Sequence, residues 1–195
     1  ESYDKLWEAL LLADASKNRD KKAFLYRDIG RHYSYYKRKE KALKFLNLSL
    51  SLRKDLYHNK KAKKATLTNA YLAFVATFRE LNDFKLAKIY LDSSAVFLQK
   101  DTMLRDRAFY TFEHGVILDY QGKCKEALKE FKTSLDWFSK ELPSYKVLIY
   151  AYVGDCYKNL REYKKSENYY LSALNLSQEY NVHKDFAPLI YQRLS

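Results

Sequence analysis

Glycine and proline are scarce in this sequence, with 4 Gly and 2 Pro among 195 residues. These residue types form most tight turns, and an all-β chain of this length would need many of them, so an all-β fold is excluded. No stretch approaches the roughly 18 uninterrupted apolar residues of a membrane-spanning helix, so we expect no membrane insertion by this segment. The composition therefore favours an all-α protein.

The sequence also lacks an initiator methionine. Its start, Glu1-Ser2-Tyr3-Asp4, has neither the basic nor the apolar region of a signal peptide. We therefore expect a processed or trimmed product. A cytoplasmic location is favoured, and a periplasmic one stays open if a leader has been removed.

The sequence shows no recognisable catalytic or metal-binding motif. Cys124 and Cys156 are the two cysteines, and they form no CxxC motif and have no neighbouring His. This spacing excludes the usual zinc motifs, and we expect both cysteines to pack in the core without a disulfide. The sequence contains no HExxH motif, no glycine-rich phosphate loop and no nucleophile elbow. We therefore predict a protein that is not an enzyme, with no catalytic residues, no metal and no cofactor.

The positive charge is concentrated near one end of the chain. The formal net charge is +12, and the segment Arg31–Lys64 holds 12 Lys and Arg residues against only Glu40 and Asp55. Such a block indicates an acidic partner, nucleic acid or an anionic surface. A solvated lysine-rich face with no partner is the alternative.

One pattern of large and small residues occurs four times. The copies start at residues 23, 68, 108 and 147, so they are spaced by 45, 40 and 39 residues. Large side chains recur at helical spacing, and small residues stand where two helices of a unit would approach closely. The shared positions are Tyr26, Ile29, Gly30, Tyr33, Ala42, Leu46 and Ser49; Tyr71, Phe74, Val75, Phe78, Ala87, Leu91 and Ser94; Thr111, His114, Gly115, Leu118, Ala127, Phe131 and Ser134; and Tyr150, Val153, Gly154, Tyr157, Ser166, Tyr170 and Ala173.

This pattern resembles the consensus W-x2-L-G-x2-Y, A-x3-F, A of the tetratricopeptide-repeat (TPR) family. The resemblance implies an all-α fold, a right-handed α-α superhelix of about ten helices in antiparallel pairs. The consensus proline at the end of each repeat is absent. The repeats also exceed the usual length of about 34 residues, as in bacterial TPR regulatory or sensor domains.

We predict a single domain over residues 1–195. Asn82 and Gly122 lie between predicted helices, where a left-handed residue ends a helix. The last segment stops inside a helix, so we expect a fragment of a longer protein. The predicted parts are a half-repeat at 2–17, full repeats at 23–61, 68–101, 108–141 and 147–180, and a truncated fifth repeat at 188–195.

The resemblance also implies where a ligand would bind. In TPR proteins the second, fifth, ninth and twelfth places of each repeat face the concave groove, with the sixth alongside. Arg27 and Arg31 lie four residues apart on one helix face and would jointly hold a carboxylate or phosphate. Phe109 and Phe112 would receive an apolar anchor. The full candidate set is Arg27, Arg31, Asn69, Arg79, Phe109, Phe112, Tyr152 and Asp155.

The carboxylate clamp of chaperone-binding TPR domains is absent, because Arg27, Arg31, Ala73, Phe109 and Glu113 hold its places. We predict a non-catalytic scaffold that binds a protein or peptide, with an acidic ligand favoured, as the sensing module of a larger signalling or transcription-regulatory protein. A nucleic-acid-binding scaffold is the alternative. Self-association through uncapped solenoid ends is a third interpretation.

Overall fold

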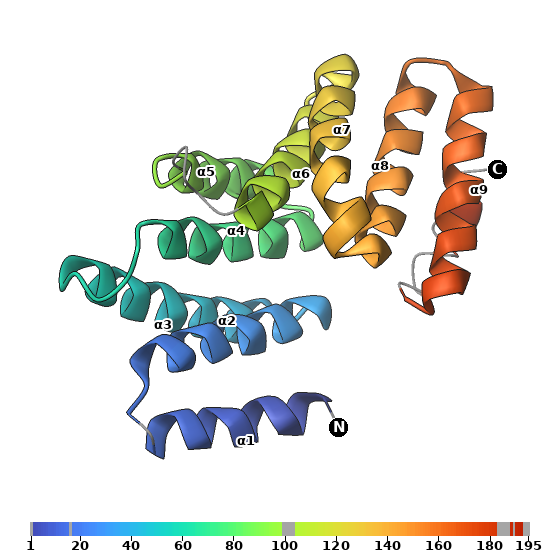
Figure 1. Ribbon diagram of the computed structural model, residues 1–195. Helices are drawn as coiled ribbons and strands as arrows, with labels where there is room; N and C mark the ends of the chain where they lie inside the picture. The colour runs from blue at the N-terminus through green and yellow to red at the C-terminus, as the bar shows by residue number, and fades with distance from the viewer. Residues whose placement is uncertain (1, 16, 99–103, 183–187, 189, 193–195) are drawn as a thin grey trace. The chain divides into compact units, whose positions relative to one another are not determined.

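Helices make up almost all of the described residues, which are 2–15, 17–98, 104–182, 188 and 190–192, and no β-strand occurs among them (Figure 1). The computed structural model confirms the all-α fold of antiparallel helix pairs predicted from the sequence. In chain order the elements are α1 (Ser2–Ala15), α2 (Arg19–Tyr35), α3 (Lys39–His58), α4 (Ala65–Glu80), α5 (Phe84–Ala95), α6 (Leu104–Tyr120), α7 (Cys124–Glu141), the 3-10 turn η1 (Pro143–Tyr145), α8 (Lys146–Asn159) and α9 (Tyr163–Tyr180).

The chain divides into two compact units, Glu1–Asp106 and Arg107–Ser195, with the boundary in the first turn of α6. Within these units the pairs α2–α3, α4–α5, α6–α7 and α8–α9 fall on the four predicted repeats, and α1 falls on the half-repeat. Of the predicted fifth repeat, Pro188 and residues 190–192 are helical, and the rest lies outside the described residues. No helix in the described part of the chain is long and apolar enough to cross a membrane.

The same turn joins the two helices of every repeat. One residue of each turn has a left-handed backbone, and the next amide donates to the carbonyl five residues earlier, as Arg38 does to Tyr33 at 2.9 Å. This is the Schellman arrangement that ends helices. The left-handed residues are Lys37, Asn82, Gly122 and Arg161, with φ of 57°, 60°, 75° and 63°. The sequence predicted this turn at Asn82 and Gly122. At Lys37 and Arg161 the positive φ costs about 1 kcal/mol each relative to glycine.

Small residues allow the two helices of a repeat to touch. A Cβ placed on Gly154 would lie 2.5 Å from the ring of Tyr170 on α9, and one on Gly115 would lie 2.7 Å from Phe131. Gly30 stands in the same relation to Leu46 at 2.8 Å. The predicted close approach of the paired helices is therefore confirmed in these three repeats.

Each unit has its own core. In the first unit α1 packs on α2 through Leu10, Ala13, Leu25 and Ile29. In the second unit Tyr170 and Ala173 of α9 pack with Ala151 of α8 and with Ile190. Ile190, from the predicted fifth repeat, is fully buried in this cluster.

We expect Gly154→Ala to lower the free energy of unfolding by about 1–3 kcal/mol, because the added methyl overlaps the Tyr170 ring. Urea denaturation followed by circular dichroism measures the loss. In a Tyr170→Leu background the same substitution should cost less, because the ring is gone. Equal costs in both backgrounds would contradict this contact.

Candidate functional site

A polar network runs along the first helices of the first unit. Arg27 on α2 donates from Nε and Nη2 to Oδ1 of Asp28, at 2.9 and 2.7 Å, and from Nη1 to Oδ1 of Asn69 on α4. Asn69 in turn donates from Nδ2 to Oδ1 of Asp106 at the start of α6, at 3.2 Å. Arg27 and Asn69, two of the predicted site residues, are therefore in direct contact.

A second set of polar contacts links α2 to the end of α4. Arg31 donates from Nη2 to Oε1 of Glu80 at 2.7 Å, and Ser34 donates to Oε2 of the same carboxylate at 2.6 Å. Lys37 donates to the backbone oxygen of Glu80. Arg79, the neighbour of Glu80, is buried, and its Nη2 lies 3.9 Å from Glu80 Oε1. Glu80 thus gathers three basic side chains and a hydroxyl.

Two acids of this face, Glu80 and Asp106, titrate in opposite directions. For Glu80, burial raises the pKa, but the charges of Arg31 and Arg79 and the hydrogen bonds from Ser34 and Arg31 outweigh it, so the pKa lies below its ordinary value. For Asp106, burial dominates, and its pKa lies above the ordinary value despite the hydrogen bond from Asn69. Glu80 is therefore the firmly charged member of the face.

The two arginines of the predicted basic face are not free cations. Each of these two arginines has a carboxylate partner, Asp28 and Glu80, which the sequence reasoning missed. Asp28 follows Arg27 directly in the chain, so this pairing could have been predicted from the sequence. Glu80 lies 49 residues from Arg31, and no local pattern links them.

The second unit gathers aromatic rings around its first helices. Phe112 is fully buried, so the expectation that it receives an anchor side chain is wrong for this arrangement. The cause is the turn η1, which brings the Tyr145 ring to 5.2 Å from Phe112 and stacks it on Phe138 at 4.5 Å. Tyr152 of α8 packs against Phe112 from another side, with ring centroids 5.8 Å apart.

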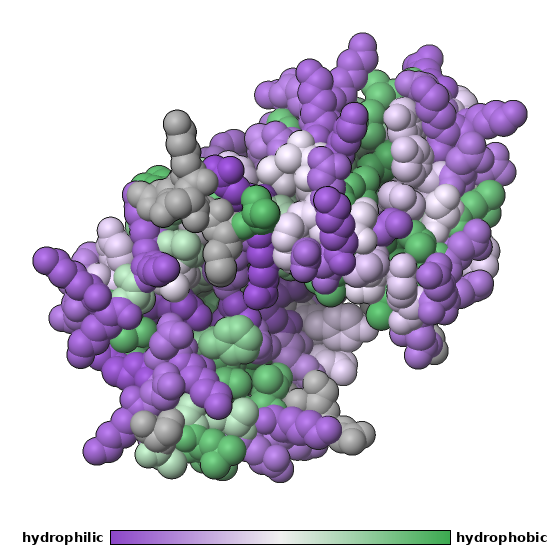
Figure 2. All heavy atoms as spheres, viewed as in Figure 1, coloured by the Kyte–Doolittle hydropathy of each residue, from purple (hydrophilic) through white to green (hydrophobic). Residues whose placement is uncertain are grey.

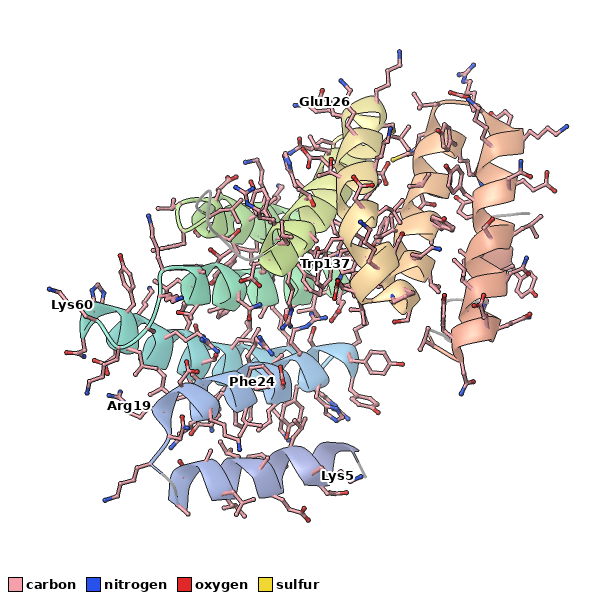
Figure 3. The ribbon with its side chains drawn as sticks, viewed as in Figure 1. Lys5, Arg19, Phe24, Lys60, Glu126 and Trp137 are labelled. Atoms are coloured by element: carbon pink, nitrogen blue, oxygen red, sulfur yellow. The ribbon has the colours of Figure 1, made fainter. Side chains whose placement is uncertain are left out.

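Phe109 remains half-buried beside this cluster. Its ring meets Trp137, Phe138 and Tyr145 at centroid distances of 6.3, 5.0 and 5.3 Å. Figure 3 labels Trp137 on α7. Of the predicted residues in this unit, Phe109 and Tyr152 are partly accessible, and Asp155 accepts a hydrogen bond from the Tyr170 hydroxyl at 2.7 Å.

The basic block Arg31–Lys64 begins on α2 at Arg31, and its last lysines lie at the end of α3 and in the connection to α4. Lys60, labelled in Figure 3, is exposed, as are Lys61 and Lys63. Tyr71 of α4 stacks on Phe97 with centroids 5.5 Å apart. The flanking cations sit over these rings: Lys54 Nζ lies 5.8 Å from the Tyr71 centroid, and Lys64 Nζ lies 5.8 Å from the Phe97 centroid.

Comparison with known proteins places the fold. No family model matches the chain, and no curated protein matches its sequence. Among solved structures, BtubC (BKLC) from P. vanneervenii matches with a TM-score of 0.62 and 18% identity, covering 94% of this chain and 76% of that one. A Rap protein complexed with Competence and Sporulation Factor matches with a TM-score of 0.64 and 16% identity, covering 99% of this chain and 57% of that one.

These likenesses, at 18% and 16% identity, show the fold, which is that of a helical-repeat solenoid. They agree with the four-fold repeat of the Schellman turn and with the close approach at Gly30, Gly115 and Gly154. The chain spans just over half the length of the Rap protein that it matches.

Glu80→Gln should lower the free energy of unfolding at neutral pH by about 1.5–3 kcal/mol, because charged hydrogen bonds to Arg31 and Ser34 are weakened. A carboxyl with a lowered pKa in the folded state stabilises the protein above its unfolded pKa of about 4.3, and this contribution is lost as the pH falls through the folded value. Denaturation curves of wild type and variant should therefore converge in acid. A constant difference from neutral pH to well below that value would contradict the pairing.

Proposed function

We propose that this chain is a non-catalytic scaffold that binds a peptide or protein segment along the first helices of its first unit. The observation that carries the proposal is the pre-arranged guanidinium pair on α2. Arg27 and Arg31 are one turn apart, and each is held by a side chain of the same face rather than extended into solvent. Because both arginine side chains are already held in place, ligand binding costs little of their conformational entropy.

The surroundings of the pair suit an acidic segment with an apolar or aromatic neighbour. The Arg27 guanidinium lies 4.2 Å from the centroid of the Phe24 ring, which is 40% exposed. The Arg31 side chain is 31% exposed, although its Nη1, which has no hydrogen-bond acceptor in the described part of the chain, is buried. A ligand carboxylate would therefore bind the exposed edge of the Arg31 guanidinium in competition with Glu80, and Phe24 would cover apolar atoms beside it.

Asp28 and Glu80 set a limit on the charge of the ligand. Because Asp28 and Glu80 already pair with the two arginines, a ligand has to offer carboxylates placed well enough to compete for the guanidinium groups. The ligand we propose therefore carries one or two well-placed carboxylates. Hydrogen bonds to the guanidinium groups contribute more to recognition of this ligand than the long-range electrostatic field of the protein does.

The finer role we propose is that of a ligand-sensing module in a larger signalling or regulatory protein. It is supported by repeats of about 40 residues, which the TPR resemblance associates with such domains. One of the similar structures is that of a Rap protein complexed with Competence and Sporulation Factor. That likeness, at 16% identity, concerns the fold, so the role is tested through the arginine pair of this chain.

Replacing both Arg27 and Arg31 by Gln should weaken binding of acidic peptides by about tenfold to a hundredfold, because two charged donors are lost. Isothermal titration with a panel of peptides that carry none, one or two carboxylate side chains measures the effect. Lys129→Gln, at an exposed site on α7, serves as a control of equal charge change per site. Equal affinities for the pair variant and for wild type would remove this face from the site.

A second candidate function is nucleic-acid binding, and it is favoured by the interleaving of lysines with aromatic rings near the α3–α4 connection. Exposed Lys60, Lys61 and Lys63 supply positive charge. The Tyr71 and Phe97 rings offer faces on which bases stack once the overlying lysines turn toward phosphate. This surface is separate from the Arg27–Arg31 face, so the two functions can be tested independently.

If the lysine surface binds single strands, affinity for labelled RNA or DNA should fall steeply with salt because bound counterions are released. Lys60→Gln, Lys61→Gln and Lys63→Gln together should reduce the slope of log affinity against log salt by about 2, at about 0.7 per phosphate contact. The Arg27 and Arg31 variant should keep the wild-type slope. A salt-independent affinity, or no binding at low salt, would exclude this function.

Self-association through the solenoid ends stays a prediction. Hydrophobic side chains gather over α1 (Figure 2), and Leu11 and Leu12 are exposed by 67% and 69% on that helix. Sedimentation over a range of protein concentrations tests whether α1 takes part.

A further inference from the structure

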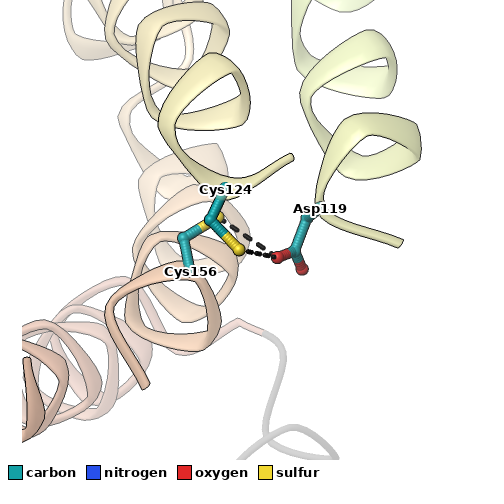
Figure 4. A group of neighbouring side chains, drawn as sticks. All are labelled: Asp119, Cys124 and Cys156. Atoms are coloured by element: carbon teal, nitrogen blue, oxygen red, sulfur yellow. Dashed lines mark hydrogen bonds between the residues drawn. The ribbon is translucent and has the colours of Figure 1, made fainter. Parts of the chain in front are cut away.

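Three potential metal ligands meet in the second unit, where α6, α7 and α8 come together (Figure 4). Asp119 lies in the last turn of α6, Cys124 is the first residue of α7, and Cys156 lies in the last turn of α8. The two sulfur atoms and a carboxylate oxygen of Asp119 all lie within 4.8 Å of one another. The cysteines are 32 positions apart in the sequence, so the spacing rules applied to the sequence did not connect them.

The distances between these atoms fit one tetrahedral ion. The Sγ atoms of Cys156 and Cys124 lie 3.3 and 3.6 Å from Oδ1 of Asp119. In a tetrahedral zinc site with Zn–S of about 2.3 Å and Zn–O of about 2.0 Å, a sulfur and an oxygen ligand are about 3.5 Å apart. The three side chains would therefore hold such an ion with only small shifts.

The repeat itself does not require these residue types. Both cysteines are buried, but neither stands at one of the shared large or small positions of the repeat. The places equivalent to Cys124 in the other repeats hold Lys39, Phe84 and Tyr163, those equivalent to Cys156 hold His32, Thr77 and Ile117, and those equivalent to Asp119 hold Ser34, Arg79 and Lys158. Packing of helix pairs thus gives no reason for two thiols and a carboxylate to converge here.

Without a metal, the cluster is held by hydrogen bonds to one oxygen atom. Both thiols donate to Oδ1 of Asp119, and Asn159 Nδ2 donates to the same oxygen at 3.3 Å. Burial, together with the nearby Asp119 charge, raises the pKa of both thiols, so they are neutral donors in this state. A bound cation would replace the two thiol protons and satisfy the same oxygen.

Asn159 also provides a fourth position and a route to it. Its side chain is exposed, so the cluster borders solvent on this side. A half-turn of the amide would present its oxygen where the nitrogen now lies, and a water molecule would fit the same place. Closed zinc sites use four ligands, and open ones keep a water as the fourth.

We propose that Asp119, Cys124 and Cys156 form a zinc site whose fourth ligand is Asn159 or water, and that the ion clips α6, α7 and α8 together. Two thiolates with one carboxylate are a ligand set that suits Zn²⁺, whereas Mg²⁺ and Ca²⁺ prefer oxygen alone. The proposal is independent of the peptide-binding function, because the site lies in the second unit and the Arg27–Arg31 face lies in the first.

The test is a titration of the reduced, metal-free chain with Zn²⁺, and with Co²⁺ as a spectroscopic substitute. We expect one ion per chain, a thiolate-to-cobalt charge-transfer absorption and the visible bands of tetrahedral cobalt. Zinc should also raise the thermal midpoint and slow amide hydrogen exchange at the joined ends of α6, α7 and α8. Absence of saturable binding, or a cobalt spectrum without thiolate absorption, would overturn the proposal.

Variants separate this site from adventitious binding. Cys124→Ser and Asp119→Asn should each weaken zinc binding by more than about tenfold, while Asp136→Asn, at an exposed site on α7, should leave it unchanged. Far-UV circular dichroism confirms that each variant is folded, and the near-isosteric Asp119→Asn guards against a folding defect. Full zinc affinity in the Cys124 variant would refute the assignment. It would also be refuted if the reduced protein took up no metal and instead only formed a Cys124–Cys156 disulfide in air.

Discussion

The contact between the two helices of a repeat is the constraint from which the rest of the structure follows. At Gly30, Gly115 and Gly154 the first helix has no side chain, and Leu46, Phe131 and Tyr170 of the second helix fill the space. The close approach fixes which faces turn inward, and the same Schellman turn returns the chain at each pair. Some side chains of the first helices outside this contact, such as Arg27, Arg31 and Phe109, form polar networks or aromatic clusters.

The repeat was readable from the sequence because its determinants are local. Small residues at helical spacing and left-handed turn residues at Asn82 and Gly122 reveal the pairs without knowledge of any distant contact. Lys37 and Arg161 take the same backbone conformation, but their side chains give no sign of it, so propensity alone would miss them. Turn geometry here is imposed by the packing of the pair rather than chosen by the turn residue.

The candidate sites were less predictable, because they depend on partners far apart in the chain. The carboxylate of Glu80 pairs with Arg31, and a three-residue turn at Pro143–Tyr145 helps to bury Phe112. The eight residues chosen from the consensus positions do lie on the first helices. The consensus does not say which other residues cover or pair with their side chains. Asp119, Cys124 and Cys156 converge for the same reason, since three separate helices bring them to one point.

The uniform turns within repeats have a consequence for where the chain can vary in length. If the two helices of each pair are joined by a fixed turn, the difference between a spacing of 45 residues and one of 39 must fall in the second helices and in the connections that follow them. The first such connection, after α3, is also where the exposed lysines gather. Insertions at this point cost little loop entropy and leave the paired helices untouched. An epitope or fluorophore can therefore be inserted in this connection without disturbing the packing of the helix pairs.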